Sequence, residues 1–510
     1  MAMKSVGPIF SRIPIGLNAH CISIECHIAP GLPGTTIVGL AEGAVKESRD
    51  RVKSALRNNG FNYPNGHVII NLAPGNLAKS GTGFDLPIAL AILQASGQVN
   101  IPNRENTEFI GELGLFGELR PINGILTCAL ASSKANKRLV MPAQNEQEAS
   151  LVKGGDLLVA PNLSELIKHL SAHEPNDVRC PAPQKGAVRP VQQSTYGQII
   201  GQLGAKKGLL VAAAGGHHLI MLGPPGAGKT MLARSFIDLL PTLSDQSSLE
   251  VATIYSSIGL ERSDHTKVPF RDPHHSISSA AMVGGGQQPQ PGEVALAHKG
   301  VLFLDELPHF KPATLDLLRE PIETGHAVIA RAKYRVSFPC DFQLIAAMNP
   351  CPAGRSCKED GCRCGPSQVQ KYRGRVSGPL LDRIDLHVQV PELDQLLLAK
   401  LQKQNVSTED PLPQLKEKVI AAMNVQLKRQ GCLNVKLSGK ALDAEVASAH
   451  ISEAFLEKAI EQFHLSARSY HKIWRIARTL ADLDQQSTIS EANFLQALNF
   501  RSINWEADSI

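Results

Sequence analysis

The chain has 510 residues, of which 43% are hydrophobic and 19% charged, and its formal net charge is +5. These values are typical of a soluble globular protein with about three domains. The charge is too small to indicate nucleic-acid binding by itself, so any basic surface must be local. No run of about 18 apolar residues is present to span a bilayer, and the first residues lack the apolar core of a signal peptide. We therefore expect a cytoplasmic protein without a membrane partner.

Residues 1–171 combine β-type runs such as HVIINLA with helical runs such as DLPIALAILQASG, which predicts an α+β or α/β domain. One predicted amphipathic helix, 44–59, carries the basic residues Arg49, Arg51, Lys53 and Arg57 along its length. These side chains could meet DNA, although a solvated helix face is the simpler interpretation. Residues 172–195 are rich in Pro, Gln and small polar residues and are predicted to form a linker.

After the linker, residues 196–395 alternate between apolar strands and helices, which predicts a parallel sheet with helices on both faces. The expected strands lie near 217–222, 301–304, 342–347 and 385–390. From 396 to 510 the β-type patterns stop and helical stretches such as SYHKIWRIARTLADL follow. This last part is predicted to be a helical domain.

The most informative segment is 223–230, where an apolar run opens into the pattern G-x-x-x-x-G-K-T. Its glycines let backbone N–H groups turn inward toward phosphate oxygens, and the following helix directs its positive end at the same point. Lys229 would reach the β- and γ-phosphates, and the Thr230 hydroxyl would bind Mg²⁺. The predicted nucleotide-binding residues are Gly223, Pro224, Pro225, Gly226, Ala227, Gly228, Lys229 and Thr230.

Two further apolar strands end in polar residues that suit hydrolysis. The segment VLFLDEL delivers Asp305 and Glu306 to the carboxyl end of a strand, where ligands gather in open α/β sheets. Asp305 would hold Mg²⁺, and Glu306 would orient or deprotonate the attacking water. The strand FQLIAAMNP ends at Asn349, which either contacts the γ-phosphate or the water, or is an ordinary turn residue before proline. The sequence therefore predicts an Mg²⁺-dependent nucleotide hydrolase.

Two arginines beyond these strands are candidates for a role in hydrolysis. Arg383 ends a short helix in SGPLLDRIDLHV and could reach the phosphates of a neighbouring subunit, unless it is a simple surface residue. An arginine supplied in this way is worth roughly 10³–10⁵ in rate. Arg468 opens a helix of the C-terminal region and could couple that region to the nucleotide. Arg475 and Arg478, on the same helix, are weaker candidates.

A basic hairpin is predicted at 326–339, HAVIARAKYRVSFP, which alternates as strands around Arg331, Lys333 and Arg335. With Tyr334 between these charges, its tip could contact DNA phosphates and stack on bases in the pore of a ring. A solvated hairpin with routine charges is the alternative.

Four cysteines lie close together in a glycine-containing loop: Cys351, Cys357, Cys362 and Cys364. Four thiolates suffice for a tetrahedral Zn²⁺ site. Their spacing differs from paired C-x-x-C motifs, so free or redox-labile thiols are the alternative. In a cytosolic chain we do not expect disulfides.

Four longer segments resemble the magnesium-chelatase-like AAA+ ATPases, specifically the ComM/YifB family, and the resemblance extends from about residue 5 to residue 500. They are PHHSISSAAMVGGG (273–286), PGEVALAHKGVLFLDELPHF (291–310), AAMNPCPAG (346–354) and SGPLLDRIDLHV (377–388). The resemblance implies five matched motifs: Walker A (Lys229, Thr230), Walker B (Asp305, Glu306), sensor 1 (Asn349), arginine finger (Arg383) and sensor 2 (Arg468). It also implies a ring hexamer, because the finger acts in trans, and DNA branch migration in natural transformation.

The N-terminal region resembles the catalytic domain of Lon proteases over 72–93 and 111–145. The Lon signature falls on Lys79 to Asp85, which places Gly83 where that family has its nucleophilic serine. Ser80 lies out of register with that position.

The activating lysine of Lon proteases is expected near Cys128, but Leu126, Thr127 and Cys128 occupy that stretch. Covalent catalysis cannot proceed without a nucleophile and its activating amine. We expect a Lon-like fold without peptidase activity that serves as a scaffold or a nucleic-acid platform.

The expected fold class is α/β: an AAA+ P-loop domain with a parallel sheet, a helical lid at the C-terminus and a Lon-protease-like α+β domain at the N-terminus. The expected function is an ATP-driven hexameric DNA motor that uses Mg²⁺ and acts on single-stranded or branched DNA, with recombination proteins as possible partners. Two alternatives stay open. The chain could drive metal insertion by a partner complex, as a chelatase motor does, or it could remodel or regulate proteins.

Overall fold

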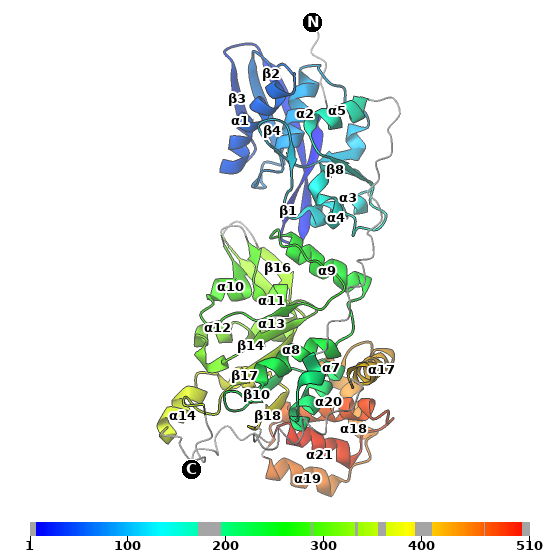
Figure 1. The fold of residues 1–510 in the computed structure, drawn as a ribbon. Helices are drawn as coiled ribbons and strands as arrows, with labels where there is room; N and C mark the ends of the chain where they lie inside the picture. Colours follow the sequence, from blue (N-terminus) through cyan, green and yellow to red (C-terminus); the bar gives the residue numbers. More distant parts are fainter. Residues whose placement is uncertain are drawn as a thin grey trace. The chain divides into compact units, whose positions relative to one another are not determined.

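The computed structural model describes seven stretches of the chain: 7–171, 195–286, 289–331, 335–354, 364–392, 411–463 and 465–501. The chain forms two compact units (Figure 1). Unit 1 comprises Met1–Val188 together with Asp245–His265, and unit 2 comprises Arg189–Ser244 together with Thr266–Ile510. The predicted linker lies outside the described residues except for Thr195, which begins the first helix of unit 2.

Unit 1 is built on a seven-stranded mixed sheet with the order β3-β4-β2-β1-β5-β8-β9. The pairs β1–β2 and β2–β4 are antiparallel, whereas β5, β8 and β9 continue from β1 in parallel. The strands are β1 (Ile9–Ile15), β2 (Asn18–Ala29), β3 (Gly34–Val38), β4 (His67–Ala73), β5 (Thr107–Phe109), β8 (Arg138–Pro142) and β9 (Leu157–Ala160). A separate hairpin joins β6 (Glu112–Leu113) and β7 (Leu119–Arg120).

The helices of unit 1 cover this sheet because their apolar residues need a buried surface. They are α1 (Gly43–Asn58), α2 (Asp85–Ala95), α3 (Ile125–Lys134), α4 (Glu146–Ala149), α5 (Leu163–Ser171) and α9 (Asp245–Ser256). Helix α2, DLPIALAILQA, is apolar on every side and is buried almost completely, as expected for a helix in a domain core.

Helix α9 belongs to unit 1 although its sequence lies inside the stretch that we predicted to be the ATPase domain. Ala252 is buried in the same apolar cluster as Ile125 and Leu126 of α3, and the N–H of Gly124 donates to the carbonyl oxygen of Ser256 at 2.8 Å. Such packing between segments about 130 residues apart in sequence leaves no local signal, which is why the sequence analysis did not separate α9 from its neighbours.

Unit 2 contains the predicted parallel sheet, with five strands in the order β11-β14-β17-β10-β18. The strands are β11 (Phe270–Arg271), β14 (Val301–Leu304), β17 (Gln343–Met348), β10 (Leu219–Leu222) and β18 (Leu386–Gln389). Two small hairpins accompany it: β12 (Gly284–Gly285) with β13 (Gln290–Pro291), and β15 (His326–Ala330) with β16 (Arg335–Pro339). Strand β10 pairs with β17 on one side and with β18 on the other, so Leu219 lies opposite both Ile345 and Leu386.

Helices pack around this sheet and continue to the end of the described chain. Two helices precede the first strand of unit 2: α6 (Thr195–Gln198) and α7 (Leu203–Gly215). Between the strands lie α8 (Lys229–Leu239), α10 (Ser279–Val283), α11 (Glu293–Leu296), α12 (Pro312–Asp316), α13 (Arg319–Thr324), α14 (Pro366–Arg373) and α15 (Gly378–Leu381). The C-terminal helices are α17 (Leu412–Gln430), α18 (Gly439–Ala447), α19 (Glu453–Gln462), α20 (Ala467–Leu483) and α21 (Glu491–Asn499).

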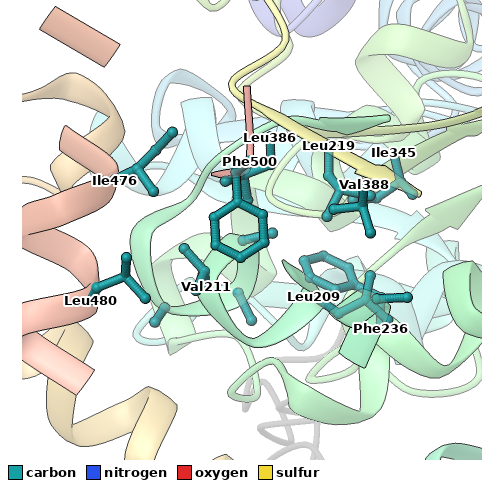
Figure 2. Packing of buried hydrophobic residues seen from close by; sticks show 14 of the residues in the cluster. Leu209, Val211, Leu219, Phe236, Ile345, Leu386, Val388, Ile476, Leu480 and Phe500 are labelled. Carbon is teal, nitrogen blue, oxygen red and sulfur yellow. The ribbon is translucent and has the colours of Figure 1, made fainter. Parts of the chain in front are cut away.

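The C-terminal helices share one hydrophobic core with the sheet (Figure 2). Ile476 and Leu480 of α20 lie in the same buried cluster as Leu209 of α7 and Phe236 of α8. Strand residues such as Leu386 complete it. A rotation of α20 would therefore disturb the packing of the helix that follows 223–230, which links the helical region to that loop mechanically.

Candidate functional site

The predicted phosphate loop connects β10 to α8. Gly226 and Gly228 have φ values of 79° and 88°, in the left-handed region, and a Cβ at either residue would meet nothing within 4 Å. Gly223 is needed for another reason, since its Cβ would lie 2.2 Å from the carbonyl oxygen of Val390. The loop thus forms an open, glycine-lined turn at the start of a helix, which is the geometry that backbone N–H groups need to bind phosphates.

Lys229 lies at the centre of this turn and is 8% exposed. Its Nζ donates to the carbonyl oxygens of Gly223 at 2.7 Å and Pro224 at 2.8 Å, and to Oδ1 of Asn349 at 3.0 Å. Burial lowers the pKa of Lys229, while the charge of Asp305 acts in the opposite direction. The structure therefore brings together Lys229, which begins α8 after the loop that follows β10, and Asn349, which directly follows the neighbouring strand β17.

Thr230 and Asp305 also meet. The Thr230 hydroxyl donates to Oδ2 of Asp305 at 2.7 Å, and the backbone N–H of Glu306 donates to Oδ1 of Asp305 at 2.9 Å. A hydroxyl and a carboxylate are oxygen donors that suit Mg²⁺ beside a nucleotide phosphate, so this pair fits the predicted metal. Glu306 directly follows Asp305 in the sequence. Its side chain is 54% exposed, so a water molecule can reach its carboxylate.

Glu306 has a neighbour, His275, that the sequence motifs did not predict. Nδ1 of His275 lies 3.8 Å from Oε2 of Glu306. The His275 ring is in turn 4.1 Å from the His274 ring and 5.8 Å from the His309 ring, measured between centroids. The only sequence signal was that His274 and His275 lie in the first of the segments that resemble the AAA+ family.

The two candidate arginines, Arg383 and Arg468, contact the same glutamate, Glu323, rather than the phosphate loop. Nη2 of Arg383 lies 2.7 Å from Oε1 of Glu323, and Nη2 of Arg468 donates to the same oxygen at 2.6 Å. In the described part of the chain, no hydrogen bond or ion pair joins either arginine to residues 223–230. Nothing in the local sequence around Glu323 indicated that it would pair with both arginines.

The weaker candidates hold the helical region together. Arg478 is 1% exposed and donates to the carbonyl oxygens of Gln486 and Ser487, and Nε of Arg475 donates to the carbonyl oxygen of Leu437. Because these contacts occupy the guanidinium groups inside unit 2, both residues serve packing and position.

The predicted basic hairpin is the pair β15–β16, with Ala330 opposite Arg335. Its residues alternate between buried and exposed, and Arg331 and Arg335 are exposed beside the tip. Lys333 lies outside the described residues.

The predicted zinc site is described only in part, because Cys357 and Cys362 lie outside the described residues. Cys351 is buried and Cys364 is partly exposed. Within the described ranges, no group of three or more His, Cys, Asp or Glu residues is arranged to hold a metal. Zinc binding by these cysteines stays a prediction.

In the Lon-like segment of unit 1, hydrocarbon lies against the position of the missing serine. A Cβ at Gly83 would lie 3.2 Å from Cγ1 of Ile110 and 3.7 Å from Cδ1 of Ile122. Cys128, near the expected lysine, is fully buried, and burial raises its pKa to about 12. Such a thiol stays protonated and is a poor nucleophile.

The charged residues of this segment are used internally. Lys79 is fully buried and its Nζ donates to the carbonyl oxygen of Pro74. Asp85, also fully buried, accepts from Nε of Arg51 at 2.7 Å and from the hydroxyl of Ser48. Arg51 is therefore a structural partner of Asp85, and contact of this helix with DNA stays a prediction. Arg49 is exposed and paired with its neighbour Asp50.

This parallel sheet, with a phosphate loop on β10, an acidic pair after β14 and Asn349 after the strand between them, defines an AAA+ P-loop protein. Three family models match the chain: magnesium chelatase, subunit ChlI, over 195–397; subunit ChlI of Mg-chelatase over 24–145; and the ChlI C-terminal model over 411–501. The chain belongs to the ComM/YifB family of magnesium-chelatase-like AAA+ proteins.

Relatives cover nearly the whole chain. Competence protein ComM of Haemophilus influenzae is 41% identical over 503 residues, 98% of this chain and 98% of that protein. The protein YifB of Escherichia coli is 41% identical over 502 residues, again 98% of each. Similarity to Lon protease 2 of Bacillus subtilis is partial, with 27% identity over 195 residues, 33% of this chain and 35% of that protein.

The family and the predicted fold class are thereby confirmed. No helix in the described residues is long and apolar enough to cross a membrane.

Proposed function

We propose that this chain is an Mg²⁺-dependent ATPase that works as a ring, with six subunits, and moves DNA strands during the integration of incoming DNA. The observation that carries the proposal is that one compact unit holds both the paired side chains at the phosphate loop, Lys229 with Asn349 and Thr230 with Asp305, and an exposed basic hairpin. The relationship to a protein named for competence supports DNA as the substrate.

In this proposal the chain's own residues prepare ATP for hydrolysis. The backbone N–H groups of 223–230 and Lys229 bind the phosphates, which replace the carbonyl oxygens that Lys229 now contacts. Thr230 and Asp305 would hold Mg²⁺, which supplies charge neutralisation between the phosphates when it is bound. Glu306 accepts a proton from the attacking water or orients it, and Asn349 lies beside Lys229 to fix the γ-phosphate.

Arg383 and Arg468 would complete the site of a neighbouring subunit. They converge on Glu323 and make no described contact with their own phosphate loop, which suits a role in trans. Two charges delivered to the transferring phosphate by a neighbour would make hydrolysis depend on assembly, as in other finger-dependent NTPases.

The hairpin β15–β16 would contact DNA. Arg331 and Arg335 flank its tip on the exposed side, where they can neutralise phosphates without desolvating a core. In a ring, six such hairpins would line the central pore and advance the DNA as each subunit hydrolyses ATP.

The test is ATP turnover with and without single-stranded or forked DNA. We expect stimulation and retention on DNA, both reduced in Arg331→Gln/Arg335→Gln. Lys418→Gln/Lys428→Gln removes the same charge from exposed positions on α17 and should behave as wild type. Absence of stimulation together with absence of DNA retention at roughly 0.1 M salt would refute the DNA motor.

Action in trans has its own test. Lys229→Ala and Arg383→Ala subunits should each be inactive alone, because the first lacks a phosphate site and the second lacks the finger. Mixed rings should regain turnover at interfaces that pair an intact loop with an intact Arg383. Full activity of Arg383→Ala alone would contradict the finger assignment.

The family models named for a magnesium chelatase subunit favour a second candidate, an ATPase that drives metal insertion by a partner complex. ATP turnover that is indifferent to DNA but rises with a partner protein would favour this candidate or protein remodelling.

A further inference from the structure

Two arginines from distant parts of unit 2 share one carboxylate oxygen. Arg383 follows α15, Arg468 lies in the first turn of α20, and both meet Oε1 of Glu323 on α13, at 2.7 Å and 2.6 Å. The Arg383 side chain is only 10% exposed, and its Nη1 also donates to the carbonyl oxygen of Pro379. Guanidinium groups that converge on one anionic oxygen form the arrangement by which arginines bind a phosphate oxygen.

The two arginines are held as one group by a second, buried ion pair. Lys472 lies one helical turn after Arg468, and its Nζ is 2.9 Å from Oδ1 of Asp385, two residues after Arg383. The side chains of Lys472 and Asp385 are 8% and 4% exposed. Breaking a buried pair leaves an uncompensated charge, so α20 and the segment that carries Arg383 stay joined and move together.

Glu323 is connected directly to the basic hairpin. Helix α13 ends at Thr324 and β15 begins at His326, with Gly325 between them. The N–H of Cys340, just after β16, donates to the carbonyl oxygen of Gly325 at 2.8 Å, and the N–H of Gly325 donates to Pro321 of α13 at 2.9 Å. Both ends of the hairpin are therefore tied to the helix that carries Glu323.

We propose that Glu323 is a latch residue: its carboxylate occupies the anion position between Arg383 and Arg468 until DNA contact at the hairpin β15–β16 withdraws it, which frees both arginines for the phosphates of the neighbouring subunit. This rests on the proposed function, since it assumes that Arg383 acts in trans and that the hairpin meets DNA. The latch adds a way in which DNA would regulate ATP hydrolysis at the site that Arg383 completes.

The ion pairs of Glu323 with Arg383 and Arg468 are weak enough for a nucleotide phosphate to replace the carboxylate reversibly. Burial acts to raise the pKa of Glu323, but the hydrogen bonds and charges of Arg383 and Arg468 outweigh it and lower the pKa, so the carboxylate is charged at neutral pH. Glu323 and Arg468 are 45% and 50% exposed, and ion pairs in such positions are weak. A nucleotide phosphate carries more negative charge than one carboxylate and would displace it. By linkage, whatever favours displacement of Glu323 also favours the DNA-engaged hairpin.

The test is Glu323→Gln in the full-length protein, with ATP turnover measured at saturating ATP with and without forked DNA. We expect the DNA-free rate to rise by roughly two- to fivefold, the factor for losing a partly exposed ion pair. Stimulation by DNA should fall by a similar factor, because the latch is already open. Glu320→Gln is the matched control: it lies one turn earlier on α13, is exposed, and should leave both rates unchanged.

Arg383→Ala and the double variant Glu323→Gln/Arg383→Ala show whether the expected rise in the DNA-free rate of ATP turnover requires Arg383. Both should be inactive. If Arg383→Ala loses turnover while Glu323→Gln behaves as wild type or is slower without DNA, the latch is wrong and the proposed motor stands. If Arg383→Ala retains full turnover, the finger assignment fails and the latch fails with it.

Discussion

The segments 79–85 in unit 1 and 223–230 in unit 2 both combine glycines with a lysine, yet their surroundings differ. Around Gly226 and Gly228 a Cβ would meet nothing within 4 Å, whereas a Cβ at Gly83 would touch Ile110 at 3.2 Å. Both lysines are buried, but Lys229 also contacts the polar residue Asn349 from a neighbouring strand, while only the carbonyl oxygen of Pro74 is a described hydrogen-bond partner of the Lys79 amine. The loop 223–230 is open at two of its glycines, whereas Ile110 bounds position 83, where Lon proteases carry the nucleophilic serine. The buried lysine of 223–230 thus lies beside open space at a strand edge, whereas the charged residues of 79–85 make internal contacts that hold unit 1 together.

The largest expected effect concerns chemistry in unit 2. Glu306→Gln should lower the rate of ATP hydrolysis by roughly 10²–10⁴ because the amide cannot accept a proton from water. Binding of ATP should be retained, since Lys229 and Thr230 are unchanged, and so should the melting temperature, since the Glu306 side chain is 54% exposed. Steady-state turnover and equilibrium nucleotide binding separate the two effects. Turnover close to wild type would remove Glu306 from the mechanism.

The next effect concerns stability in unit 1. Arg51→Met should lower the free energy of unfolding of unit 1 by roughly 3 kcal/mol, because the fully buried carboxylate of Asp85 loses its cationic partner. The sequence ranges of unit 1 contain neither of the two tryptophans, Trp474 and Trp505, so tryptophan fluorescence does not report the unfolding of unit 1. Far-UV circular dichroism should thus show an early transition that tryptophan fluorescence does not.

Arg49→Met is the matched control for Arg51→Met. Arg49 lies on the same helix but is exposed and pairs only with Asp50 on the surface, so its loss should not shift the unfolding of unit 1. Equal destabilisation by both variants would mean that Arg51 has no special structural role.

Lowering the pH should destabilise unit 2 because of His218, which immediately precedes β10. Burial lowers the pKa of His218 to about 4, and its Nδ1 accepts the N–H of Leu344 at 3.0 Å. The unfolded chain, with an ordinary histidine pKa, binds more protons between about pH 6.5 and pH 4, so the stability of unit 2 should fall by roughly 1–3 kcal/mol as the pH drops through this window. Urea titrations followed by tryptophan fluorescence at about pH 7 and pH 5 measure it.

His218→Asn should reduce this pH dependence, because the amide oxygen still accepts the Leu344 N–H and does not titrate. Some dependence should persist, since burial also lowers the pKa of His387 to about 3. His471→Asn, exposed on α20, should leave the pH dependence as in wild type. If the stability of unit 2 depended on pH in His218→Asn as it does in wild type, groups other than His218 would be responsible for the pH dependence.

Much of the nucleotide site was predictable because it depends on one rule of topology. The carboxyl ends of parallel strands meet at one edge of a sheet, so polar residues after three strands had to come together, and Lys229 does contact Asn349 while Thr230 contacts Asp305. The arginine arrangement was not predictable. Glu323 is 145 residues from Arg468, and only the packing of α20 against the rest of unit 2 brings them together. Helix α9 escaped prediction for the same reason, since its partners are in the N-terminal half of the chain.

The smallest expected effect tests whether unit 1 can regain the lost chemistry. Gly83→Ser should cleave no peptide and react with no serine-directed probe, because Thr127 and Cys128 stand where the activating lysine is expected. The added Cβ would press on Ile110 at 3.2 Å and cost about 1 kcal/mol of stability. Gly83→Ala adds the same Cβ without a hydroxyl, so equal unfolding curves for the two variants would assign the cost to packing. Covalent labelling of Gly83→Ser alone would mean that an activating base survives nearby, and unit 1 would then have retained a catalytic site.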